Sequence, residues 1–120
     1  SSIDQQVSLK IILCGQENLS QILKRASYAD LVHRITLQFV IHPLSKQKTA
    51  AYIDYRITKA GGADKIFETE TKELIHDYTG GVPRQINNVA TACLINAAAK
   101  SLKQITEALV NETMTEFSLP

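Results

Sequence analysis

The turn Gly80-Gly81-Val82-Pro83-Arg84 contains the residue types best suited to meet an anion. Two glycines end one helical pattern, and Pro83 suits the first turn of the helix that follows. Arg84 then lies at the amino-terminal end of that helix, beside free backbone N–H groups and the positive end of the helix dipole. Phosphate is the ligand that this arrangement favours. The alternative is ordinary punctuation between two helices, with Arg84 as a solvated charge.

Two further polar residues stand where α/β proteins place ligand contacts. Gln16 directly follows the apolar run 8–15, so it lies at the carboxyl end of a predicted strand. Its side-chain amide can hold a water or a phosphate oxygen there, or it is a plain turn residue. Arg34 lies between a predicted helix and a predicted strand, from where an arginine can project toward a neighbouring subunit. The alternative for Arg34 is a surface charge without a function.

Other kinds of chemistry find little support in the chain. Its three histidines, His33, His42 and His76, lack the spacing of a metal site or a catalytic pair, so we expect no metal. Cys14 and Cys93 lie far apart in apolar surroundings, which predicts buried free thiols in a reducing cytoplasm. No G-x-x-x-x-G-K-[ST] loop and no apolar strand ending in adjacent acids is present. These 120 residues alone therefore cannot run P-loop hydrolysis.

The composition is that of an ordinary soluble globular protein, with 44% hydrophobic and 21% charged residues. Thirteen basic and twelve acidic residues leave a formal charge of +1, so no global field recruits nucleic acid or a membrane. There is no signal peptide and no apolar run near the roughly 20 residues that a membrane span needs. The composition therefore predicts a cytoplasmic location.

The hydrophobic pattern predicts the order strand, helix, helix, strand and then four helices. The predicted strands are 8–15 and 35–42, the second stopped by Pro43, and helices 17–25 and 28–33 lie between them. The later helices are 46–60, 69–78, 83 to about 100 and 107–117, with Ser45 and Thr106 as N-caps. Core positions predicted on these helices are Ala51, Ile53, Tyr55, Ile57, Leu74, Ile75, Tyr78, Ile86, Val89, Ala90, Cys93, Leu94, Ala97, Leu109, Val110, Met114 and Phe117.

This order predicts the end of an α/β layer in residues 1–43 and an all-α bundle in residues 44–120. A layer of two strands is too small to be complete, so the chain is predicted to be a piece of a larger module.

A series of short motifs follows in unbroken order over nearly the whole chain. They are 9–16 (LKIILCGQ), Arg34-Ile35, Pro43-Leu44-Ser45, 49–53 with Arg56, Ile66-Phe67 after a Gly-Gly turn, Leu74-Ile75-His76 and 80–87 (GGVPRQIN). The series resembles AAA+ ATPases of the ExeA type, which include the general secretion pathway protein A ATPases and the ATPase partners of bacterial transposases. Two departures are Glu17, where a proline is usual, and Glu68, where a helix-capping threonine is usual.

The resemblance implies the C-terminal part of an AAA+ P-loop NTPase module, with the core ending at 43 and a helical lid in 44–120. Gln16 would be sensor 1, which positions the attacking water near the γ-phosphate. Arg34 would be the arginine finger that reaches the nucleotide of an adjacent subunit. Arg84 would be sensor 2, in a nucleotide-binding turn with Pro83 and Gly81. ATP and Mg²⁺ would be cofactors of the full-length parent, and none is expected bound to this part alone.

The same resemblance implies a function and partners. The parent would be an ATPase that couples ATP binding and hydrolysis to oligomerisation and to the remodelling of a partner. This part alone is expected to be inactive because the Walker A and Walker B motifs are absent. Expected partners are further copies of the protein and either DNA with a transposase or secretion-apparatus proteins. The choice between transposition and secretion stays open.

Two other classes of function compete with this interpretation. Residues 69–100 also fit a helix-turn-helix that binds DNA, with Arg84, Gln85, Asn87 and Asn88 at the start of its recognition helix. Against it, lysine and arginine are not concentrated on that segment. The third interpretation is a helical protein–protein interaction module without a ligand.

The missing part of the module has a physical consequence. In the AAA+ sheet, the two strands predicted here flank the strand that leads into the P-loop, so without it they have unpaired edges. We expect the 120-residue chain to pair these strands abnormally or to associate with another copy. Gel filtration with light scattering tests this, and a clean monomer at high concentration would contradict it.

Overall fold

The structure is a computed structural model that describes residues 8–63 and 65–117. The outer ends of the two predicted domains, residues 1–7 and 118–120, lie outside these ranges. The chain divides into two compact units, Ser1–Val40 and Ile41–Pro120.

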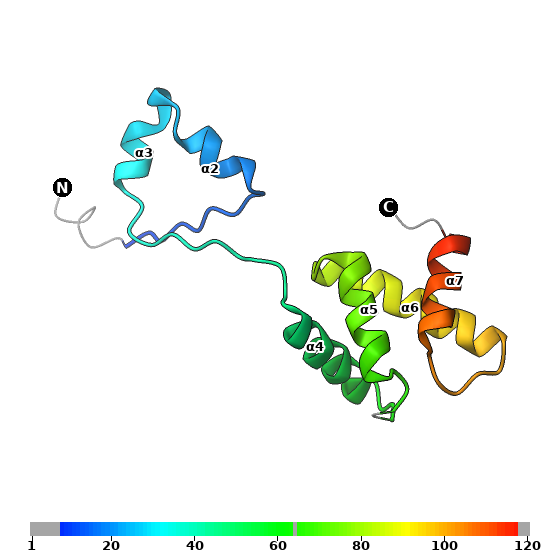
Figure 1. Ribbon diagram of the computed structural model, residues 1–120. Coiled ribbons are helices and arrows are strands. Elements are labelled where there is room, and N and C mark those ends of the chain that lie inside the picture. The colour runs from blue at the N-terminus through cyan, green and yellow to red at the C-terminus, as the bar shows by residue number, and fades with distance from the viewer. Residues whose placement is uncertain (1–7, 64, 118–120) are drawn as a thin grey trace. The chain divides into compact units, whose positions relative to one another are not determined.

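The first unit contains the two short helices that the sequence predicts. They are α2 (Asn18–Leu23) and α3 (Ala29–His33), with the 3-10 turn η1 (Ala26–Tyr28) leading into α3 (Figure 1). Leu19, Ile22 and Leu23 form the half-buried face of α2, as its apolar spacing indicates. No helix of this unit has a fully buried residue among those described.

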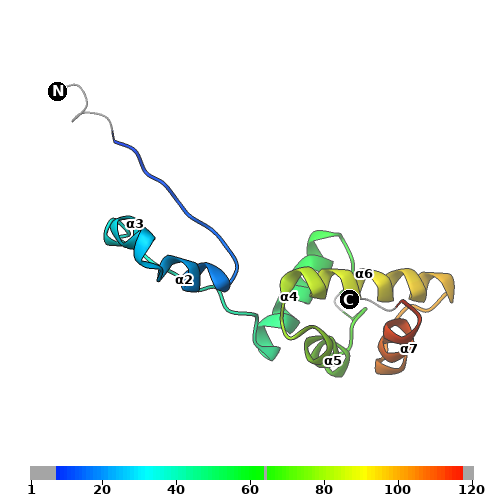
Figure 2. The ribbon, with the colours of Figure 1, turned by 90° about the horizontal axis from the view of Figure 1, so that it is seen from above.

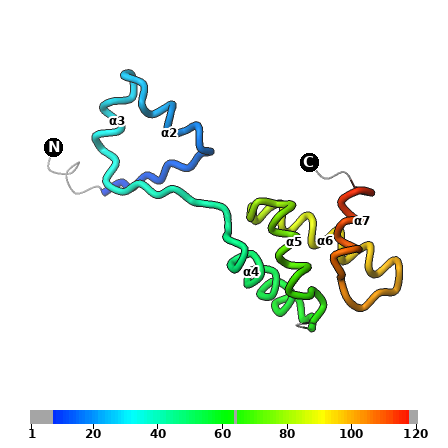
Figure 3. Tube along the Cα trace, in the orientation of Figure 1, coloured from blue at the N-terminus to red at the C-terminus, as the bar shows by residue number. Residues whose placement is uncertain are grey.

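The two predicted strands are not formed in the described part of this chain. Residues 8–16 and 35–45 are extended but unpaired, and in Figure 3 the segments 8–16 and 35–40 run in the same direction across the view. Their apolar side chains are exposed: Ile12 by 87%, Phe39 by 83% and Ile41 by 94%. The prediction of an α/β layer is therefore wrong for the described residues. A strand forms only where a neighbour meets its N–H and C=O groups, and neither segment has such a neighbour among residues 8–63 and 65–117.

The second unit confirms the helical half of the predicted fold. Its helices are α4 (Lys46–Lys59), α5 (Thr69–Thr79), α6 (Pro83–Ala99) and α7 (Glu107–Phe117). Both predicted N-caps are present: Ser45 Oγ accepts from the Lys48 N–H at 3.2 Å, and Thr106 Oγ1 accepts from the Leu109 N–H at 3.3 Å. No helix among the described residues has both the length and the apolar character needed to cross a membrane.

Helix α5 packs against each of the other three helices of this unit, and α6 lies across them (Figure 2). Ile75 on α5 is fully buried, together with Ile105 and Val110. The backbone of Ile105 joins the loop before α7 to the loop before α5, since its N–H donates to the Ile66 carbonyl at 2.8 Å. The hydroxyl of Thr71 on α5 donates to the Ile105 carbonyl at 2.9 Å. These contacts fix the loop before α7 onto α5.

Polar contacts between the helices add to this apolar core. The ammonium of Lys72 on α5 is largely buried and lies 2.9 Å from a carboxylate oxygen of Asp54 on α4. Asn96 on α6 donates to the Thr113 hydroxyl on α7 at 3.0 Å, and both side chains are buried. Because these groups are satisfied in pairs, their burial does not leave a charge or an amide without a partner.

Four predicted core residues are exposed instead: Ala51, Tyr55, Tyr78 and Phe117. Helix α4 buries Thr49 and Ile53 and half-buries Ile57, which stand four residues apart along one face. Tyr55 lies two residues after Ile53, so it points away from that face and is 58% exposed. The ammonium of Lys59 lies 5.8 Å from the centre of its ring.

Substitution of Ile75 by alanine is expected to lower the free energy of unfolding by about 2–5 kcal/mol, because it leaves a cavity where α5 meets the core. Ile95→Ala is the matched control, since Ile95 is helical but 60% exposed; its effect should stay within about 0.5 kcal/mol. Urea unfolding followed by circular dichroism measures both. Equal effects of the two variants would contradict the core assignment.

Candidate functional site

The turn between α5 and α6 has the geometry that the sequence predicts. Gly80 has a φ of 62° and its N–H donates to the His76 carbonyl at 2.8 Å, which ends α5. Gly81 has a φ of 81°, Val82 is the N-cap of α6 and Pro83 is its first residue. Arg84 is thus the second residue of a helix of 17 residues.

The Arg84 side chain is exposed and makes no hydrogen bond or ion pair with another described residue. Its guanidinium therefore has all its donors available beside the amino-terminal end of α6. This placement suits an incoming anion. The role of Arg84 as a nucleotide sensor, with Pro83 and Gly81 in the same turn, stays a prediction.

The other two candidate residues belong to the first unit. Gln16 is exposed in the turn before α2, and its backbone carbonyl accepts from the Leu19 N–H at 2.9 Å. Arg34 is exposed at the carboxyl end of α3, where its N–H donates to the Leu31 carbonyl at 3.0 Å. Their roles as sensor 1 and arginine finger stay predictions as well.

The helix-turn-helix interpretation is not favoured by the contacts of α6. One of its four base-reading candidates, Asn87, accepts a hydrogen bond from the Tyr52 hydroxyl on α4 at 2.9 Å. That contact holds α4 against α6 and uses the side-chain oxygen internally. Arg84, Gln85 and Asn88 remain exposed, without the lysine and arginine residues that phosphate contacts along DNA require.

The part of the chain that the structure describes contains no candidate metal site and no candidate thiol active site. It contains no group of three or more His, Cys, Asp or Glu side chains that could hold a metal ion. Both cysteines are free, as predicted, but Cys14 is exposed, so its predicted burial is wrong. Cys93 is fully buried, and this burial raises the pKa of its thiol against the smaller opposing effect of a hydrogen bond with Thr113. Cys93 is thus a core residue without nucleophilic character.

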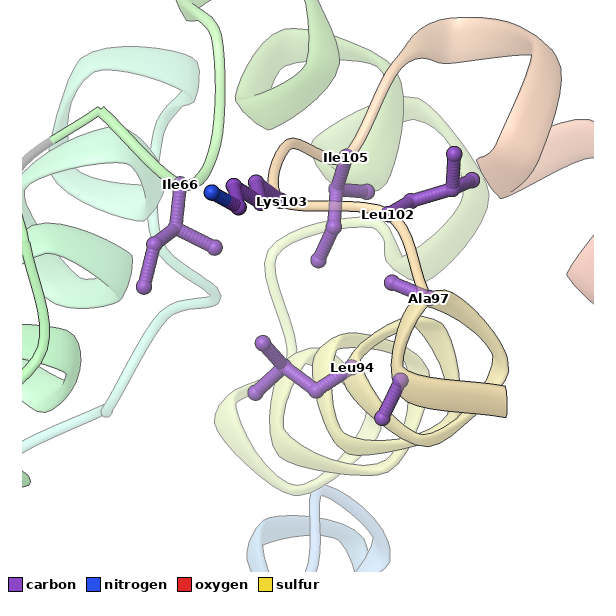
Figure 4. Close-up of a pocket in the computed structure, with 7 residues that line it drawn as sticks. Ile66, Leu94, Ala97, Leu102, Lys103 and Ile105 are labelled. Carbon is purple, nitrogen blue, oxygen red and sulfur yellow. The ribbon is translucent and has the colours of Figure 1, made fainter. Parts of the chain in front are cut away.

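A cavity of about 210 Å³ opens at the end of α6. Figure 4 shows apolar side chains around it, with the Lys103 nitrogen as its charged group; the lining residues are Ile66, Leu94, Ala97, Ala98, Leu102, Lys103 and Ile105. None of the predicted site residues lines it. The cavity is therefore separate from the turn that carries Arg84.

Comparison with known proteins supports the resemblance that the motif series indicates. Over 115 residues, the chain is 32% identical to General secretion pathway protein A of Aeromonas hydrophila. The match covers 96% of this chain and 21% of that protein, so the chain spans about a fifth of the length of this relative. No protein-family model matches the chain, and no solved structure matches it significantly.

One residue of the second unit was not recognised as part of a site from the sequence. His76 appeared there only as one of three histidines without the spacing of a metal site and as the end of the Leu-Ile-His motif. In the structure its Nε2 lies 3.1 Å from the Leu44 carbonyl oxygen, and its Nδ1 is buried without a hydrogen-bond partner among the described residues. Only the three-dimensional contact reveals this arrangement, because the two residues are 32 positions apart.

The different burial of the two cysteines predicts different reactivity. In the folded chain, Cys14 should react with a thiol reagent on the order of a hundredfold or more faster than Cys93, since a buried thiol reacts only when the structure opens. Labelling followed by mass spectrometry measures both rates, and Cys14→Ser isolates the slow one. Similar rates in the native state, with similar rates also in urea, would contradict the burial of Cys93.

Proposed function

We propose that this chain is the C-terminal part of an AAA+ ATPase module of the ExeA type, from a secretion-associated protein. Residues 1–43 would end the α/β core and residues 44–120 would form the helical lid. The observation that carries this proposal is the 32% identity to General secretion pathway protein A over 96% of the chain. The ordered motif series and the four helices of the second unit are consistent with it.

In this proposal, Arg84 senses the nucleotide. Its exposed guanidinium and the N–H groups of Arg84 and Gln85 carry positive charge in the first turn of the same helix, α6. A γ-phosphate is the group of ATP whose charge changes most when hydrolysis proceeds. Arg84 would therefore respond to the nucleotide state more than it would contribute to binding.

Gln16 and Arg34 would act at the same nucleotide from the core. Gln16 would hold the attacking water with its side-chain amide, and Arg34 would reach the nucleotide of a neighbouring subunit. Arginine suits this role because its planar, permanently charged donors match phosphate oxygens. A role in trans requires several copies of the protein, so the proposal includes oligomerisation.

The described residues suit the phosphates of ATP better than they suit Mg²⁺. Arginine and glutamine side chains suit phosphate oxygens, but no cluster of carboxylates among these residues suits a metal ion. Mg²⁺ and most contacts to ATP would therefore come from the longer protein. When bound, the metal supplies charge neutralisation at the phosphates, and the residues of this chain orient water and report the state.

The partner would be a component of a secretion apparatus. The name of the similar Aeromonas protein carries this assignment. Neither the charge of the chain nor the contacts of α6 favour DNA or a transposase as the partner.

The proposal is tested by Arg84→Ala in the longer protein that carries these residues. Loss of a charge-assisted contact to the transferred phosphate should lower kcat for ATP hydrolysis by about tenfold to a hundredfold, while the fold of the lid is unchanged. Gln85→Ala is the matched control, because Gln85 is the exposed neighbour on the same turn. Unchanged hydrolysis in Arg84→Ala would overturn the proposed role.

A further inference from the structure

The cavity at the end of α6 lies where that helix carries small side chains. Ala97 and Ala98 line it and leave space that larger side chains would occupy, and Leu94 and Leu102 add apolar walls (Figure 4). Its volume is about 210 Å³. A cavity of about 150 Å³ already holds benzene, whereas sites for drug-sized ligands measure roughly 300–1,000 Å³. This cavity therefore has room for one aliphatic side chain and is too small for a nucleotide or a similar cofactor.

Hydrogen bonds hold the loop that forms one wall of the cavity. The Leu102 N–H donates to the Ala97 carbonyl at 2.9 Å, and the Ile105 N–H donates to the Ile66 carbonyl at 2.8 Å. Between α6 and Leu102, Ser101 has a φ of 57°, in the left-handed region that serine seldom adopts. Because these contacts fix the wall in the free chain, a ligand does not have to order it on binding.

Lys103 is the charged residue of this lining. It stands between Leu102 and Ile105, the two lining residues whose backbone is fixed, and its side chain is exposed. It forms no ion pair with another residue that the structure describes, whereas Lys100 pairs with Glu112. An unpaired ammonium group beside an apolar cavity attracts an anionic group and repels a cationic one. The charge of the site thus complements an acidic ligand.

Apolar surface continues outside the cavity. Ile95 is 60% exposed and precedes Ala98 by three residues, so the two lie on one face of α6. Leu102 lines the cavity and is still 48% exposed. A free carboxylate small enough for the cavity would leave this outer surface in water. A polypeptide can fill the cavity and cover the surface around it, so the arrangement favours a protein segment over a metabolite.

We propose that this cavity binds a leucine or isoleucine side chain of a partner polypeptide, and that Lys103 pairs with an acidic residue beside that side chain. The apolar side chain supplies most of the affinity, because anchors that enter a preformed pocket dominate binding. The ion pair is exposed, so it contributes selectivity more than affinity. The inference does not rest on the proposed function, since no residue of the Arg84 turn lines the cavity.

Titration of the ¹⁵N-labelled 120-residue chain with blocked peptides, followed by NMR, tests this site. A peptide with one leucine between two glutamates should shift the amide signals of Leu94, Ala97 and Ile105, with a Kd on the order of a millimolar because the peptide is short and flexible. Replacing its leucine by alanine should weaken binding by about tenfold or more. Replacing its glutamates by glutamine should weaken binding by only about twofold to fivefold.

Two pairs of variants separate the apolar and the charged part of the site. Ala98→Leu should fill the cavity and weaken the leucine peptide by about tenfold or more, and the exposure of Ala98 leaves the helix able to form. Ala99→Leu is the matched control, because Ala99 is exposed but does not line the cavity. Lys103→Gln should abolish the preference for glutamate over glutamine. Lys48→Gln removes the same charge from an exposed position on α4 and should keep that preference.

Several results would overturn the proposal: unshifted signals of the lining residues, equal binding of the leucine and alanine peptides, or unchanged binding in Ala98→Leu. An equal preference for glutamate in Lys103→Gln and Lys48→Gln would exclude Lys103 as the pairing group. Hexanoate is tested alone as well, and binding as tight as that of the peptide would replace the polypeptide partner by a small carboxylate. Unchanged ATP hydrolysis in Arg84→Ala removes the proposed sensor role and leaves each of these results as it is.

Discussion

The burial of α5 against the other three helices of the second unit is the contact on which the rest of that unit depends. Ile75 on this helix is fully buried, and Thr71 on the same helix fixes the loop that leads into α7. The carboxyl end of α5 also supplies His76 and the glycine turn. One helix therefore supports both the core of the unit and the contact of His76 with the Leu44 carbonyl.

In the first unit, two apolar segments stay exposed because their backbone hydrogen bonds need a partner strand. Its extended segments carry apolar residues such as Ile12 and Phe39, which are as hydrophobic as those of the helical core. A helix satisfies its own backbone hydrogen bonds, whereas a strand depends on another strand. The helices thus form from local residues alone, whereas the two strand-like segments have no pairing partner in the part of the chain that the structure describes. This difference accounts for the half of the predicted fold that is correct and the half that is not.

The candidate site shows how far local patterns extend. The punctuation by Gly80, Gly81 and Pro83 was predictable, because left-handed backbone and the first turn of a helix select these residue types. The exposed position of Arg84 followed from that punctuation. The close approach of Gly81 to Leu44 was not predictable, because the two residues are far apart in the chain. A Cβ atom on residue 81 would lie 1.9 Å from the Leu44 carbonyl oxygen. The hydrogen bond from the Tyr52 hydroxyl to Asn87 was not predictable either, and it uses the side-chain oxygen that the helix-turn-helix interpretation assigned to base reading.

The sequence by itself determined the four helices of the second unit, their N-caps at Ser45 and Thr106, and the turn that places Arg84 at a helix start. These features depend on interactions within a few residues, which local residue types specify. Tertiary structure decided which faces are buried, so that Thr49 is inside and Tyr55 outside. It also decided that Leu44 is bound to Gly81 and His76, and that the extended segments of the first unit remain single. Such outcomes depend on which distant groups meet, and that is a property of the folded chain as a whole.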